Sequence, residues 1–217
     1  MRQHVIGFAI AMLCLSAPEA WGQDVASQTV AGGQPCAAAA GHLVRIVAFG
    51  GSNTYGKNLP RSDAYPAQLE KLLIADGYTA TVKNEGVSGI TTPEELDRLN
   101  GAVPDGTDIV IFQPGGNDAY STHRHGALSI EDVEKNIGEI VQRLQARKIS
   151  VVLSAGKVKQ EALAQLNVPM INELNQLVPR EERQPDGQHL TPAGYGLVAQ
   201  AVRPVVEQVI CKRLSPD

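Results

Sequence analysis

Residues 43–56, LVRIVAFGGSNTYG, carry the strongest indication of the fold. Up to Phe49 this stretch is apolar except for one arginine, as expected of a strand that is covered on both faces. Two glycines and Ser52 follow, and they indicate a tight turn into a helix. A hydroxyl at that turn is exposed beside unpaired backbone N–H groups. Ser52 is therefore a candidate nucleophile, and a glycine-rich turn that binds phosphate is the alternative.

From residue 43 onward, strand-like and helix-like stretches alternate along the chain. Several of the strands are almost entirely apolar, and alternation of this kind predicts a three-layer α/β/α sandwich around a parallel sheet of about five strands. We expect strands at 43–49, 78–83, 107–112, 149–154 and 168–172, and helices at 66–76, 92–100, 129–147, 157–166 and 191–212.

The N-terminal segment is typical of a secretory signal peptide. A weakly basic start precedes an apolar run at residues 5–17, and small residues follow near Gly22. The run is shorter than the roughly 20 apolar residues of a membrane span. We therefore expect a signal peptide at residues 1–22, an extended lead-in at 23–42, a single domain at 43–213, and a secreted or periplasmic protein without stable membrane insertion.

Charge and cysteine content limit the possible partners. The net charge is −4, and no long basic block occurs, which argues against nucleic acid as a partner. Beyond the signal peptide, the cysteines are Cys36 and Cys211, near opposite ends of the domain. In an oxidising compartment a disulfide between them is expected, and two free thiols are the alternative.

Three later segments could complete a catalytic site around Ser52. Asp186 precedes His189 by three residues, so the carboxylate could orient the imidazole that takes the serine proton. Gly86 and Asn117 follow the second and third expected strands, where a backbone N–H and a side-chain amide could stabilise an oxyanion. Taken singly, each segment could be an ordinary turn. Together they predict a serine-dependent ester hydrolase.

With these residues in order, the chain from residue 43 to about 205 resembles the SGNH, or GDSL-type, hydrolase family. The four residues that give the family its name match Ser52, Gly86, Asn117 and His189, and the aspartate of its triad matches Asp186. The resemblance implies a flavodoxin-like fold and an acyl-serine mechanism. It also implies an oxyanion hole formed by Ser52, Gly86 and Asn117, with no metal or organic cofactor. The segment SDAYPAQL, residues 62–69, is similar to lysophospholipase-, thioesterase- and arylesterase-like members.

One departure from the family pattern concerns the nucleophile block. The usual G-D-S-L is here Gly50-Gly51-Ser52-Asn53, so the carboxylate that supports the nucleophile loop is missing at Gly51.

The expected substrate is a small-molecule, lipid or glycan acyl ester. Two alternatives stay open: an O-acetyl esterase or acyltransferase acting on polysaccharide, and a non-catalytic binding module. His123 and His125 could bind a metal, but we expect a solvated loop there.

Overall fold

A computed structural model describes residues 35–119, 126–154 and 160–215 of the chain. Its centre is one sheet of five parallel strands in the order β2-β1-β3-β4-β5, which is the order of the flavodoxin-like fold that the family resemblance implies. The strands are β1 (Leu43–Gly50), β2 (Thr79–Gly86), β3 (Ile109–Gln113), β4 (Ser150–Ser154) and β5 (Met170–Ile171).

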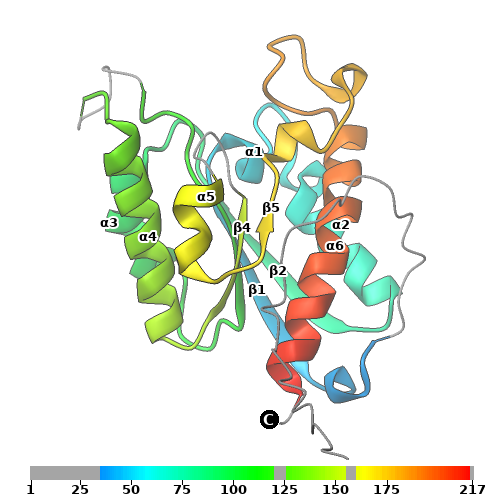
Figure 1. The fold of residues 1–217 in the computed structure, drawn as a ribbon. Coiled ribbons are helices and arrows are strands. Elements are labelled where there is room, and N and C mark those ends of the chain that lie inside the picture. Colours follow the sequence, from blue (N-terminus) through cyan, green and yellow to red (C-terminus); the bar gives the residue numbers. More distant parts are fainter. Residues whose placement is uncertain (1–34, 120–125, 155–159, 216–217) are drawn as a thin grey trace, which may run out of the picture.

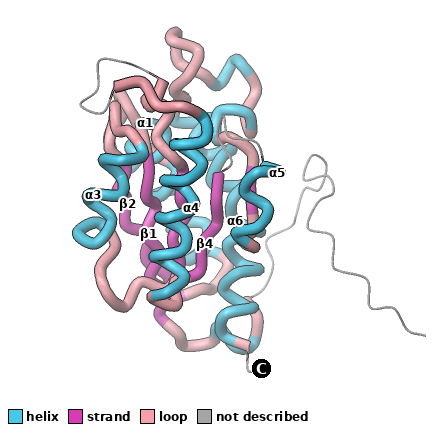
Figure 2. The backbone as a smooth tube through the Cα atoms, turned by 60° about the vertical axis from the view of Figure 1, so that its left-hand side comes forward, coloured by secondary structure: helices cyan, strands magenta, loops and turns pink. Residues whose placement is uncertain are grey.

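Helices cover both faces of the sheet, which confirms the three-layer prediction (Figure 1). They are α1 (Ser52–Tyr55), α2 (Tyr65–Ala75), α3 (Thr92–Ala102), α4 (Ile130–Ala146), α5 (Gln160–Leu163) and α6 (Pro192–Leu214). Helices α2 and α6 pack on one face, and α3 and α4 pack on the other. Figure 2 shows the strands enclosed between these helical layers.

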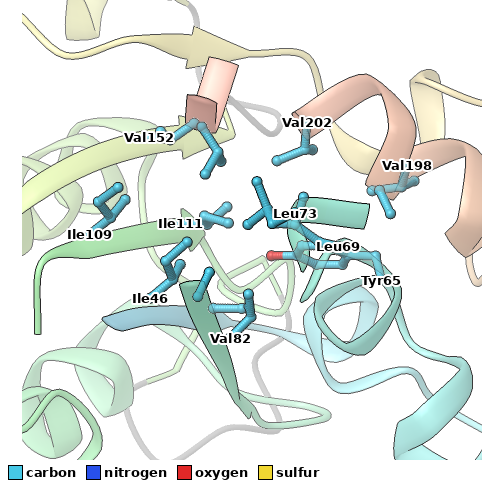
Figure 3. Close-up of a cluster of buried hydrophobic side chains, with 14 of the residues drawn as sticks. Ile46, Tyr65, Leu69, Leu73, Val82, Ile109, Ile111, Val152, Val198 and Val202 are labelled. Atoms are coloured by element: carbon cyan, nitrogen blue, oxygen red, sulfur yellow. The ribbon is translucent and has the colours of Figure 1, made fainter. Parts of the chain in front are cut away.

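The two faces of the sheet divide its apolar residues by strict alternation along the strands. Ile109 and Ile111 of β3 point into the core beneath α2 and α6, whereas Val110 and Phe112 point into the core beneath α3 and α4. Figure 3 shows the first of these cores, in which side chains of the strands, among them Ile46, Val82 and Val152, meet those of α2 and α6. By the same alternation, Gln113 at the end of β3 lies on the α2/α6 face.

Two strands differ in length from the expectation by more than one residue. Strand β2 continues to Gly86 because it pairs with β1 along its whole length, and the polar residues 84 and 85, which hid this extension in the sequence, tolerate partial exposure at the edge of the sheet. Strand β5 is only two residues long. Pro169 has no N–H to donate, although its carbonyl still accepts a hydrogen bond from Leu153.

Cys36 and Cys211 form the expected disulfide, which ties the segment before β1 to the last turns of α6. The expected signal peptide and the first part of the lead-in lie outside the described residues. Residues 35–42 contain a short 3-10 helix at Ala37–Ala39. Among the helices of the described part, none is long and apolar enough to cross a membrane.

Candidate active site

The carboxyl ends of β1 and β3, where the strand order reverses direction, carry the candidate site. Gly50 has a φ of 154°, and a Cβ there would lie 2.1 Å from the carbonyl oxygen of Gln113, so this position accepts only glycine. Gly51 is the N-cap of α1, and Ser52 is its first residue. The chain thus turns sharply out of the sheet and presents Ser52 at the start of a short helix.

Ser52, His189 and Asp186 form a continuous hydrogen-bonded chain. The Oγ of Ser52 lies 2.8 Å from Nε2 of His189, and Nδ1 of the same ring lies 2.6 Å from Oδ2 of Asp186. The imidazole is 6% exposed, so water competes little for its two ring nitrogens. The structure therefore brings together three residues that are separated by as many as 137 positions in the sequence.

The loop before α6 presents the histidine. The N–H of Gln184 donates to the carbonyl of His189 at 2.7 Å, and the N–H of Gly187 donates back to the carbonyl of Gln184 at 2.8 Å. Oδ1 of Asp186 accepts hydrogen bonds from the backbone N–H groups of Gln188 and His189, both at 2.9 Å. These bonds fold the segment into a closed turn in which the carboxylate and the imidazole face each other.

Hydrogen bonds also control the charge of Asp186. The backbone N–H of His189, and then its ring, hold the pKa of the Asp186 carboxyl well below its usual range. The carboxylate is consequently ionised at neutral and mildly acidic pH. An ionised carboxylate at Nδ1 keeps the proton on that nitrogen and leaves Nε2 free to accept the hydroxyl proton of Ser52.

Asn53 joins the nucleophile turn to the histidine loop, a role that no local sequence pattern indicates. Its Nδ2 donates to the carbonyl of Gln188 at 3.3 Å, and its Oδ1 accepts from the hydroxyl of Tyr195 in α6 at 3.2 Å. A side chain that bonds to both elements at once restricts their relative movement. The contact lies 135 residues away in sequence, so no local pattern could have indicated it.

Asn117 lies on the loop after β3, as expected. Its Nδ2 donates to the carbonyl of Ile90 at 3.2 Å, which leaves the second N–H of the amide without an acceptor among the described residues. The next residue, Asp118, is buried and accepts hydrogen bonds from the backbone N–H and the hydroxyl of Thr92, each at 2.8 Å. The loop is thereby fixed to the start of α3.

The N–H of Gly86 is already engaged in a hydrogen bond, which conflicts with the oxyanion prediction. It donates to Oδ1 of Asn84 at 3.0 Å, and a Cβ on Gly86 would lie 2.2 Å from the backbone nitrogen of Tyr55. Gly86 therefore lets β2 and α1 approach each other closely, and the prediction that its N–H faces the oxyanion is corrected on this geometry.

Gly89 is the better candidate for this donor, and the sequence reasoning missed it. It is exposed, has a φ of 83°, and its N–H makes no hydrogen bond to any described residue. Gly89 precedes Ile90, whose carbonyl accepts a hydrogen bond from the Asn117 amide. The Gly89 N–H and the Asn117 amide therefore lie on two loops that are in direct contact. The sequence feature that could have indicated this role is a glycine in the turn between Ser88 and Ile90.

The remaining candidate residues concern metal binding. His123 and His125 lie outside the described residues. Within the ranges that the structure describes, no cluster of three or more histidine, cysteine, aspartate or glutamate side chains could hold a metal ion.

Comparison with known proteins agrees with this geometry. Residues 48–197 match the model of the GDSL-like lipase/acylhydrolase family. The lipase/acylhydrolase from Enterococcus faecalis is 26% identical with a TM-score of 0.63, covering 80% of this chain and 98% of its own. AlinE4, an SGNH-hydrolase family esterase, is 27% identical with a TM-score of 0.58, covering 77% of this chain and 97% of its own.

The structure of TesA shares the fold, at 21% identity and a TM-score of 0.64, and the match covers 77% of this chain and 99% of TesA. No curated protein sequence matches the chain. The matched region contains Ser52, Asp186 and His189. It also contains the end of β1 from residue 48 onward and all of β2 to β5. The protein is an ester-bond hydrolase that belongs to the GDSL-like lipase/acylhydrolase family.

Proposed function

We propose that Ser52 is the nucleophile of a carboxylic ester hydrolase that works through an acyl-serine intermediate. The observation that carries this proposal is the hydrogen-bonded chain from Ser52 Oγ through His189 to Asp186, with links of 2.8 and 2.6 Å. Such a chain supplies what a serine hydroxyl lacks, namely a base at its oxygen and a carboxylate that orients the base.

In the first half of the reaction, His189 Nε2 takes the proton of Ser52 while Oγ bonds to the acyl carbon. The resulting imidazolium is stabilised by Asp186, and it then protonates the departing alcohol oxygen as the ester bond breaks. In the second half, His189 removes a proton from water, the hydroxide attacks the acyl carbon, and the acid leaves with Ser52 reprotonated.

The negative charge on the carbonyl oxygen requires fixed donors. The backbone N–H of Ser52 is the first N–H of α1 and makes no hydrogen bond to a described residue. The second N–H of the Asn117 amide is also unoccupied among the described residues, as is the N–H of Gly89. We assign these three groups to the oxyanion hole, with Gly89 in the place first expected of Gly86.

The Ser52→Ala variant tests the assignment. It removes the nucleophile, so turnover of p-nitrophenyl acetate is expected to fall by about three orders of magnitude or more, and labelling by a fluorophosphonate probe to disappear. Ser62→Ala is the matched control, because Ser62 is exposed and, within the described residues, its hydroxyl hydrogen-bonds to its neighbour Asp63 alone. Full labelling of the Ser52→Ala variant contradicts the proposal.

For the substrate we propose a small or flexible acyl ester, and for the location a secreted or periplasmic protein. The disulfide between Cys36 and Cys211 supports an oxidising compartment. Rates on esters of increasing acyl length, measured beside acetylated glycans, separate a general esterase from an O-acetyl esterase, whose rate falls steeply beyond acetyl or butyryl. Family membership favours either enzyme over a binding module. Fractionation of expressing cells tests the location.

A further inference from the structure

The nucleophile turn lacks the side chain that would normally stabilise the start of its helix. An N-cap side chain usually accepts a hydrogen bond from the backbone N–H of the third helical residue. In α1 the N-cap is Gly51, which has no side chain, and the third residue is Thr54. With only four residues, α1 has little stability of its own, and its first residue is Ser52.

The side chain of Gln113 supplies the missing acceptor from a different element. Its Oε1 lies 3.3 Å from the backbone nitrogen of Thr54 and 3.1 Å from the hydroxyl of the same residue. The same oxygen accepts from the N–H of Gly51 at 3.2 Å. Gln113 and Thr54 are 8% and 0% exposed, so water has little access to these bonds.

Gln113 is itself held in one orientation. Its Nε2 donates to the carbonyl of Pro114 at 2.7 Å, and this bond points Oε1 toward α1. Its backbone carbonyl accepts a second hydrogen bond from the N–H of Gly51 at 3.1 Å. Strand β3 and the nucleophile turn are therefore joined by both the backbone and the side chain of one residue.

A capping side chain at position 51 and the Gln113 carboxamide would compete for one place. A Cβ on Gly51 would be in ordinary contact with the carboxamide, 3.6 Å from both Nε2 and Oε1 of Gln113, and tight against Cα of Gly115 at 3.2 Å. An acceptor beyond that Cβ would have to reach the N–H of Thr54, which Oε1 of Gln113 already faces at 3.3 Å. The backbone of Gly51, at φ −87° and ψ −153°, is extended, so the place of the acceptor and not backbone strain distinguishes glycine from a capping residue here.

From these contacts we propose that Gln113 is a positioning residue for catalysis. From the end of the neighbouring strand β3 it caps α1, as an N-cap side chain at position 51 would, and so holds Ser52 against His189. The inference rests on the proposed role of Ser52. The Gln113 side chain hydrogen-bonds to Gly51, Thr54 and Pro114 and not to Ser52 Oγ or the imidazole, so it acts through the backbone of the turn. Its loss is expected to lower kcat and to leave KM nearly unchanged.

The test uses the esterase and fluorophosphonate assays on the full chain. Gln113→Ala removes the acceptor, and Gln113→Met removes it while keeping the side-chain volume. Each is expected to lower kcat by about ten- to a hundredfold, as a misplaced reacting group does. Adding Gly51→Asp to Gln113→Ala restores a cap that can accept from Thr54, and kcat is expected to rise about tenfold. In the protein with Gln113 intact, Gly51→Asp is expected to lower kcat.

Gly51→Asp is thus expected to raise kcat in the Gln113→Ala background and to lower it in the wild-type background. This opposite effect on kcat distinguishes positioning from packing. Gly51→Ala combined with Gln113→Ala is the matched control, because it adds a Cβ without an acceptor and is expected to restore nothing. Wild-type kcat in both Gln113 variants, or the same effect of Gly51→Asp in both backgrounds, overturns the inference and leaves Ser52 as nucleophile. A wild-type protein that the probe does not label refutes the proposed function and this inference together.

Discussion

Replacing Asp186 by asparagine tests how the carboxylate controls the proton on His189. Oδ1 of Asp186 receives two backbone N–H groups at 2.9 Å, and Oδ2 faces Nδ1 of the imidazole at 2.6 Å. An asparagine has one oxygen and one NH₂ group to fill these two places. The two backbone donors attract the oxygen, so the NH₂ group is directed at Nδ1 of His189.

In that orientation Nδ1 must accept a hydrogen bond, and the neutral imidazole carries its proton on Nε2. A protonated Nε2 cannot take the proton of Ser52, although the two atoms are 2.8 Å apart. The productive orientation requires the amide to flip and to place its NH₂ group against two backbone donors. Two broken hydrogen bonds cost about 2–6 kcal/mol. At about 1.4 kcal/mol per factor of ten, kcat is expected to fall between about 30-fold and about 10⁴-fold.

Asp186→Ala is the matched control, and it is expected to be less harmful than Asp186→Asn. The Asp186 side chain is 41% exposed, so water can reach Nδ1 once the carboxylate is gone and can accept its proton. Values of kcat for p-nitrophenyl acetate at pH 8 are measured for both variants, with melting temperatures to confirm that both fold. An asparagine variant within a few-fold of wild type, or one clearly faster than the alanine variant, refutes this reasoning.

Three further outcomes follow from the structure. Replacing Cys36 and Cys211 by serine opens a loop spanning 175 residues and is expected to cost about 3–5 kcal/mol of stability, measured by denaturant unfolding. The kcat at 25 °C should not change, because Cys211 lies about 28 Å along α6 from the histidine loop. Burial, followed by the neighbouring Asp76, raises the pKa of Glu207 to about 7, above its value in the unfolded chain. Its contribution to stability is therefore complete below about pH 4 and is lost as pH rises through 7, so melting curves from pH 5 to 8.5 should show a loss of roughly 2 kcal/mol that Glu207→Gln abolishes. Gly86→Ala forces a methyl group against the backbone of α1 and should lower both melting temperature and kcat; wild-type values for both would show that β2 and α1 do not pack as closely as described.

The architecture and most of the candidate site could be predicted from the order of residues alone. Residues 43–49 and 107–112 indicated buried parallel strands through their apolar character, and Ser129 before a periodic apolar stripe predicted the helix that is observed at Ile130–Ala146. Its hydroxyl indeed accepts the N–H of Asp132. Ser52, Asn117 and the Asp186–His189 pair could be placed because each stands in a turn beside an element, and turns and periodicity are local properties of a chain.

Which groups meet around Ser52 could not be predicted, because it depends on how distant segments pack. Gly86 and Gly89 look equivalent in sequence, but one packs against α1 with its N–H occupied while the other leaves its N–H without a partner among the described residues. The bonds from Gln113 to α1 and from Asn53 to the histidine loop join residues 59 and 135 positions apart. A glutamine at the end of a strand has the same local pattern whether it caps a neighbouring helix or faces solvent. What it binds depends on the strand order and on the space left by a glycine, and these exist only once the sheet has formed.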